Sequence, residues 1–308
     1  MRIALGLALL AVVAGAAPAA GQRADARGPA AQVDEVLALS GARRQIDALH
    51  ASVQARLRER YAALDNEAQS LLGRFLALAL RADTVYPVVR ARFRADYDAE
   101  HVAAALTWFR SPVGRKMARL ESQAAAPDAA PALREFESEL AAKPPSSERF
   151  VLINRVAEAQ NQPDFFFDAV RGLAGGIAKG VDRVQATELA SRLYELEQTA
   201  GTLAGQTRAY IDRETFILLL FTYREARDAE LDQYMRFLRS DAGRWHSRTL
   251  QQGVIEALDA SGEKAVVELM RPPAPAAPAR AAAPPKTATP TAAPPAPTKQ
   301  LPPPPAKR

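Results

Sequence analysis

The chain contains no cysteine, and this absence limits both its chemistry and its means of attachment. Disulfide bonds, thiol catalysis and thiolate metal sites are excluded. Lipid anchoring is excluded as well, because a lipoprotein carries its acyl chains on a cysteine at the cleavage point.

Histidine is almost as scarce, with only His50, His101 and His246 in the chain. None belongs to a His-Glu-x-x-His pair or lies at ligand spacing from another. Neither Ser111 nor Ser240 has a histidine and carboxylate set in view. We therefore expect no catalytic residue, no metal site and no cofactor. Paired carboxylates of the glycosidase kind stay open, because such residues meet only in the fold.

Glycine gathers in one place, as Gly172, Gly175, Gly176 and Gly180. The spacing satisfies neither the dinucleotide-binding nor the phosphate-loop pattern. Gly172, Gly176 and Gly180 follow each other at steps of four. This spacing predicts either a smooth face for close helix packing or a loosely ordered helix end.

Long apolar runs are missing except near the N-terminus. Arg2 precedes an apolar run at 3–13 and small residues through Ala20, which is the order of a secretory signal peptide. We assign 1–20 to this signal, with cleavage near Ala19 or Ala20, and expect 21–31 to be disordered. The run is too short to span a bilayer, and no later segment is longer. The Ala/Arg/Pro-rich composition is typical of bacteria, so we predict the periplasm, with secretion as the alternative.

The net charge of +5 does not indicate a nucleic-acid partner, because its distribution is uneven. Arg2 leaves with the signal, and six basic side chains lie in the tail 271–308, which has no acidic residue. The stretch between them has a net charge of −2. The tail is rich in proline and alanine, so it favours solvated polyproline II and serves as a spacer. Its charge would suit an envelope protein, a cell-wall polymer or anionic lipid.

Between signal and tail, apolar residues recur at helical spacing and almost none at strand spacing, which predicts an all-α fold. One stripe comprises Ile46, Leu49, Val53, Leu57, Tyr61 and Leu64. Asp65 is the expected N-cap of the following helix. Further helices are expected at about Asp164–Ala178, Asp182–Ala200 and Leu203–Arg224. The run Phe216–Phe221 is apolar all round, which predicts a buried helix.

Two prolines at 144–145 interrupt the helical pattern and predict a linker at 143–147. The linker separates a first antiparallel helical module, 32–142, from a related second module, 148–270. Each is long enough to bury a core of its own.

An internal repeat relates the two modules. Residues 102–115 align without a gap on 231–244, which implies a common ancestor or a common local structure. We expect Asp98 and Asp228 each to cap a helix that ends in a tight corner, followed by a second helix. The predicted corners are formed by Ser111, Pro112 and Gly114 in the first copy, and by Ser240, Asp241 and Gly243 in the second. In each, serine caps the second helix and glycine lets the preceding helix approach closely.

The first copy contains aromatic-Phe-x-Ser-Pro-x-Gly, as Trp108-Phe109-Arg110-Ser111-Pro112-Val113-Gly114. With the segment Leu37–Ala42 and the second copy, this motif resembles bacterial exported proteins that contain the domain of unknown function numbered 2059. The resemblance covers most of the body but not the tail, and the second copy lacks the proline. It implies a helical fold and export, and it brings no activity or catalytic residues.

These observations favour a non-enzymatic binding or accessory protein of the cell envelope, with an unknown ligand. We predict an interaction surface at Trp108, Arg115, Tyr234, Arg244 and Trp245. One alternative is a carrier of an apolar or lipidic ligand in an inter-helix cavity near Phe165, Phe166, Phe167 and Phe216. Another is an uncharacterised hydrolase.

Overall fold

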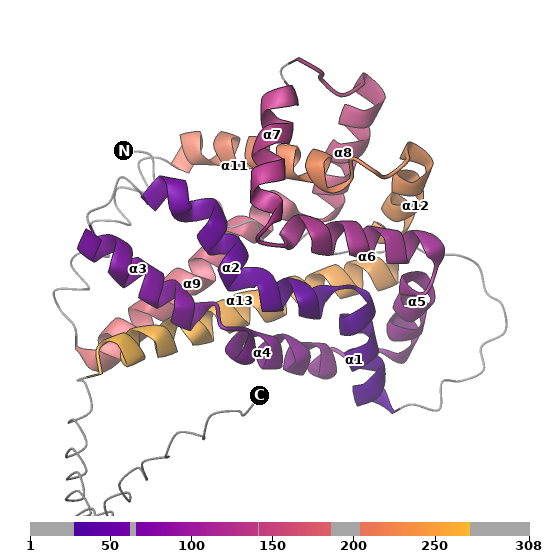
Figure 1. Ribbon diagram of the computed structural model, residues 1–308. Coiled ribbons are helices and arrows are strands. Elements are labelled where there is room, and N and C mark those ends of the chain that lie inside the picture. Colours follow the sequence, from indigo (N-terminus) through magenta and orange to yellow (C-terminus); the bar gives the residue numbers. More distant parts are fainter. Residues whose placement is uncertain (1–27, 62–65, 141, 186–203, 272–308) are drawn as a thin grey trace, which may run out of the picture. The chain divides into compact units, whose positions relative to one another are not determined.

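The computed structural model describes residues 28–61, 66–140, 142–185 and 204–271, and within these ranges every regular element is a helix (Figure 1). The prediction of an all-α fold is confirmed. The signal segment, residues 272–308, Asp65 and most of the expected helix Asp182–Ala200 lie outside the described residues, as do the side chains of Leu57 and Tyr61. The helices are α1 (Pro29–Leu39), α2 (Ala42–Tyr61), α3 (Asn66–Ala79), α4 (Ala82–Ala95), α5 (Ala99–Phe109), α6 (Pro112–Ala125), α7 (Ala129–Leu140), α8 (Ser147–Ala159), α9 (Gln162–Val184), α11 (Ala204–Thr222), α12 (Asp228–Leu238) and α13 (Asp241–Leu269).

Two expected boundaries are wrong. The segment 21–31 was expected to be disordered, but α1 begins at Pro29, because Gly28 takes the N-cap and proline suits the first helical position. A break was expected between Ala178 and Asp182, but α9 runs through to Val184. Its glycines cost helix propensity, and packing against α13 offsets that cost.

Described helices of the two halves contact one another in a similar pattern. In the first half, α1 contacts α4 and α5, and α2 contacts α6; in the second half, α8 contacts α11 and α12, and α9 contacts α13. The turn after the first helix of each half also repeats. Gly41 follows α1 with φ 80°, and Asn161 follows α8 with φ 50°. Because left-handed backbone favours glycine and tolerates asparagine, the same chain reversal is available to both halves.

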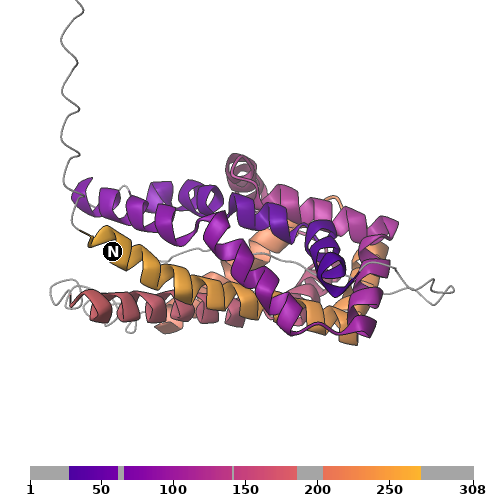
Figure 2. The ribbon, with the colours of Figure 1, turned by 90° about the horizontal axis from the view of Figure 1, so that it is seen from below.

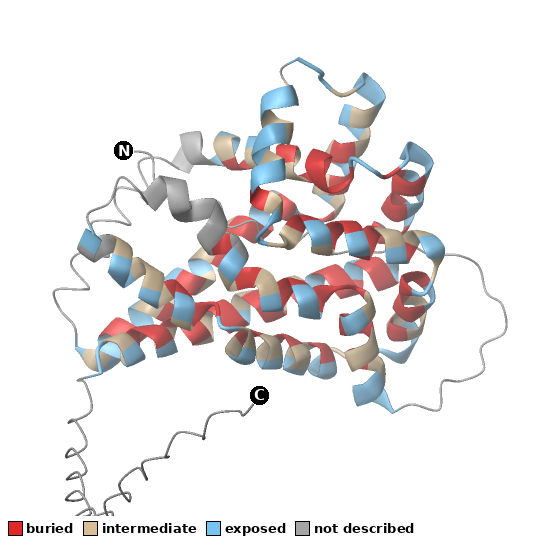
Figure 3. Cartoon of the chain, viewed as in Figure 1, coloured by how far each residue is buried: buried red, intermediate tan, exposed pale blue. Residues whose placement is uncertain are grey.

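Both halves contribute to one hydrophobic core within a single compact unit (Figure 3). The helix α13 of the second half packs against α4 and α5 of the first, while α6 of the first half packs against α11 and α12 of the second. Figure 2 shows α13 beside α9, with α4 crossing it. The linker 143–147 leads from α7 into α8, but helices of both halves meet across the core.

None of the helices in the four described ranges is long and apolar enough to cross a membrane.

Candidate functional site

The repeated corner has the local structure that the repeat predicts. Ser111 Oγ accepts a hydrogen bond from the N–H of Gly114 at 3.0 Å, and Ser240 Oγ accepts one from the N–H of Gly243 at 3.1 Å. Pro112 and Asp241 are the first residues of α6 and α13. Both serines are therefore N-caps, as expected.

The corner glycines permit the close approach of the preceding helix. A Cβ atom on Gly114 would lie 2.2 Å from the carbonyl oxygen of Trp108. On Gly243 it would lie 1.9 Å from that of Phe237. Each contact is with backbone, which cannot rotate away. Any side chain here would force the two helices of the corner apart.

One predicted cap is wrong. Asp98 Oδ1 accepts from the N–H of His101 at 2.8 Å and caps α5, but the N-cap of α12 is Arg227. The Asp-Ala-Glu segments are one residue out of register with the repeat, so Asp228 falls inside the helix. Its carboxylate instead pairs with Arg149 at 2.6 Å, and the Arg227 N–H is taken up by Glu230.

The two corners pack against each other around a local two-fold relation. The rings of Trp108 and Phe237, which occupy equivalent positions in the repeat, stack with centroids 5.8 Å apart and an interplanar angle of 13°. On one flank Lys116 of α6 contacts Glu230 of α12; on the other, Trp245 of α13 stacks on His101 of α5. Lys116 is equivalent to Trp245, and Glu230 to His101. We call this meeting of the corners the junction.

The polar side of the junction comprises Lys116, Glu121, Gln160, Tyr223, Glu230 and Tyr234. The hydroxyl of Tyr223 donates to Glu121 Oε1 at 2.8 Å, and that of Tyr234 donates to the same oxygen. Gln160 Nε2 donates to both hydroxyls, at 3.1 and 3.0 Å. Burial raises the pKa of both tyrosines well above the usual value, and the charge of Glu121 adds to the effect. These phenols therefore stay protonated and act as donors.

Glu230 completes the polar side with an ion pair. Lys116 Nζ lies 2.6 Å from Glu230 Oε2, and the carboxylate is nearly buried. Burial by itself would raise the pKa of Glu230, but hydrogen bonds from Lys116 and Arg227 lower it to about 2. The charge on Glu230 thus ties α12 to α6 across the two halves.

The aromatic side of the junction comprises Phe93, His101, Phe109, Trp245 and His246. Phe93 meets Trp245 edge to face, with ring centroids 5.5 Å apart. The indole N–H of Trp245 donates to the carbonyl oxygen of Asp96 at 2.8 Å. His246 is fully buried beside Phe93 and Phe109. This side joins α13 to α4 and α5.

The predicted interaction surface is wrong for its three aromatic residues. Trp108 is 3% exposed, Tyr234 0% and Trp245 4%, because each corner covers the aromatic side chains of the other. Arg115 and Arg244 are exposed. Their guanidinium groups donate to the carbonyl oxygens of Arg110 and Arg239 at the ends of α5 and α12, so they cap the first helix of each corner.

The glycine cluster forms a smooth helix face for close packing and not a loosely ordered helix end. A Cβ atom on Gly176 would lie 2.0 Å from the carbonyl oxygen of Asp259, and one on Gly180 would lie 2.9 Å from that of Glu263. The two helices run in the same direction, as this register shows. Lys179 pairs with Asp259 at 2.6 Å and borders the contact. The cluster is structural and holds α9 close to α13.

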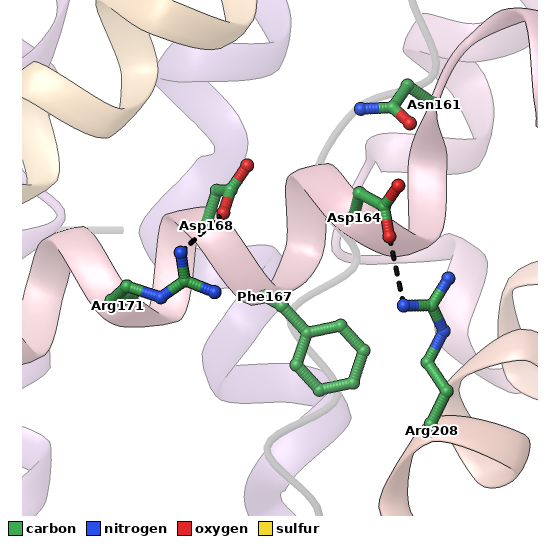
Figure 4. A pocket seen from close by; sticks show the side chains of 6 residues that line it. All are labelled: Asn161, Asp164, Phe167, Asp168, Arg171 and Arg208. Atoms are coloured by element: carbon green, nitrogen blue, oxygen red, sulfur yellow. Dashed lines mark ion pairs between the residues drawn. The ribbon is translucent and has the colours of Figure 1, made fainter.

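A hollow of about 560 Å³ lies at the start of α9 and beside α11, lined by Asn161, Asp164, Phe167, Asp168, Arg171 and Arg208 (Figure 4). Its charges are paired: Arg171 with Asp168 at 3.1 Å and Arg208 with Asp164 at 2.9 Å. Among the described residues no group of histidine and carboxylate side chains is placed to hold a metal ion.

The phenylalanines proposed to line an apolar cavity separate in the structure. Phe165 and Phe166 are buried in the core, Phe167 reaches the charged hollow, and Phe216 is partly buried. The ring centroids of Phe216 on α11 and Phe150 on α8 lie 4.7 Å apart. Phe150 is 48% exposed and its neighbour Val151 47% exposed. We call Phe150, Val151 and Phe216 the α8 face. The sequence pattern does not reveal this face, because the exposure of an apolar residue on a helix depends on which distant elements cover it.

Comparisons of the chain with protein families, with curated proteins and with solved structures found no match.

Proposed function

We propose that this protein is a non-enzymatic binding or accessory factor of the bacterial cell envelope, and that it docks through the α8 face. The observation that carries the proposal is the exposure of Phe150 and Val151 next to the ring of Phe216. Large apolar side chains exposed together are unfavourable in water and are typical of surfaces that bind another molecule.

The chemistry of the described residues supports binding rather than catalysis. Glu121, the buried carboxylate of the junction, accepts hydrogen bonds from the hydroxyls of Tyr223 and Tyr234. It lines neither the hollow at the start of α9 nor a smaller hollow lined by Pro29, Ala30, Val33, Arg94 and Tyr97. The larger hollow is lined mostly by charged side chains, which is unlike the apolar cavity that a lipid carrier needs. No specific contact among the described residues favours either the lipid carrier or the hydrolase.

Export is the second component of the proposal. It is supported by the signal-like segment 1–20 and by the resemblance to exported proteins with the domain of unknown function 2059. The N-terminal residue of the mature chain checks this component, with cleavage expected after Ala19 or Ala20.

A photo-crosslinking amino acid at Val151, used in intact cells, tests the docking surface. We expect a discrete crosslinked product that a label at the exposed Thr107 of α5 does not give. Phe150→Ser should reduce the yield at Val151 at least fivefold while the unfolding midpoint moves little. Equal products at Val151 and Thr107, or a yield unchanged by Phe150→Ser, would contradict docking at the α8 face.

A further inference from the structure

His246 is a polar residue in an apolar site. Its ring is fully buried, with the ring centroid of Phe109 at 5.1 Å and that of Phe93 at 5.5 Å. Neither ring nitrogen has a hydrogen-bond partner among the described residues. Buried polar groups are nearly always hydrogen-bonded, so this histidine is held in a neutral form at a cost in stability.

The repeat shows what the fold itself requires at this position. His246 is equivalent to Met117 in the first corner, and Met117 is likewise buried in the core. A thioether meets the packing requirement there and has no proton to exchange. The imidazole therefore adds something that packing does not require, namely a group that binds a proton near pH 6.5 once it is exposed to water.

We propose that His246 is an acid-sensitive switch: its protonation opens the packing of α13 against α4 and α5 on the aromatic side of the junction. A charged imidazolium has no acceptor in this site. The surrounding rings offer only cation–π contacts, which replace part of the lost hydration. Opening would admit water to the ring. The switch lies in the junction and does not depend on what the α8 face binds.

The charged groups on α13 and on the elements packed against it that are named below pair with residues other than His246 or are exposed. On α4, Arg92 pairs with Asp96 at 3.0 Å and with Glu256 at 3.0 Å. On α5, His101 stacks on Trp245, and on α12 Glu230 pairs with Lys116 of α6. On α13 itself Arg244 pairs with Asp241, on α3 Arg74 is exposed, and on α9 Lys179 and Arg183 pair with Asp259 and Glu263.

The direction of the pH effect follows from burial, which lowers the pKa of His246 to about 3. In the unfolded chain a histidine titrates near pH 6.5. Between these values only the unfolded chain binds the proton, so stability is complete above about pH 6.5 and falls as the pH decreases. The folding equilibrium constant then drops by up to about tenfold per pH unit. Glu230 contributes a loss of its own only below about pH 4.5, which leaves the range from 6.5 to 5 for His246.

Urea denaturation of the full chain at pH 7.5 and pH 5.0 tests the switch. For the wild type we expect the folding constant to fall about 30-fold between the two pH values. His246→Met, which installs the residue of the first corner, should reduce the fall to less than about threefold. His101→Gln, at the partly exposed histidine of the same side, should keep the wild-type response. An equal fall in His246→Met and wild type would overturn the proposal.

A second measurement needs no variant and so does not depend on whether His246→Met folds. Hydrogen exchange of the wild type at the two pH values, corrected for the intrinsic rate, should show loss of protection first in α4, α5 and the start of α13. Protection of the glycine contact between α9 and α13 should persist. Unchanged protection at pH 5.0, or a uniform loss throughout the chain, would overturn the proposal.

Discussion

The two sides of the junction share the same corner geometry but have different side chains. On the polar side, Lys116 and Glu121 of α6 bond to Glu230 and Tyr234 of α12. On the aromatic side the equivalents of Lys116 and Glu121 are Trp245 and Leu250, and the contacts are ring to ring. The serine cap and the corner glycine are the same in both. The fold thus requires the corner geometry, while the chemistry across the junction is free to differ.

Substitution of the corner glycines is expected to have the largest effect. Gly114→Ala or Gly243→Ala places a Cβ atom about 2 Å from a backbone carbonyl oxygen, so we expect a loss of about 3 kcal/mol in the free energy of unfolding for each. Gly73→Ala on α3, where nothing lies within 4 Å, should stabilise by about 0.5–1 kcal/mol. Thermal or urea unfolding measures all three. Similar effects at Gly73 and Gly243 would show that the corner is not constrained.

Removal of one hydroxyl on the polar side should cost less. Tyr234→Phe takes one donor from the buried Glu121 and leaves the ring in place, so we expect a loss of about 2 kcal/mol. Tyr97→Phe is the matched control: its hydroxyl donates to Gln32 at 2.7 Å in a partly buried site, and about 0.5–1 kcal/mol should be lost. If both variants lost the same small amount of unfolding free energy, the polar side would contribute no more than a surface hydrogen bond.

Sequence patterns predicted the local features and missed those that depend on distant partners. The serine caps at Ser111 and Ser240 and the corner glycines need only neighbours within a few residues, so the repeat was enough to find them. The burial of Trp108 and Trp245 depends on the other corner, more than 100 residues away. Glu121 looks like any exposed helix carboxylate until Tyr223 and Tyr234 are brought to it by the fold. The continuity of α9 likewise depends on contact with α13.

Substitutions at the helix caps are expected to have the smallest effects on stability. Asp98 caps α5, so Asp98→Ala should lower the free energy of unfolding by about 1 kcal/mol. Asp228 lies one residue inside α12, and its own exposed carboxylate pairs with the mostly buried Arg149, so Asp228→Ala should cost only about 0.5 kcal/mol. Ser111→Ala and Ser240→Ala, at true caps in both copies, should each cost about 1 kcal/mol and serve as references. Urea unfolding curves of the four variants at pH 7.5 resolve these differences. An Asp228→Ala loss as large as that of Asp98→Ala would mean that Asp228 caps α12 after all, and that register does not decide which aspartate is the cap.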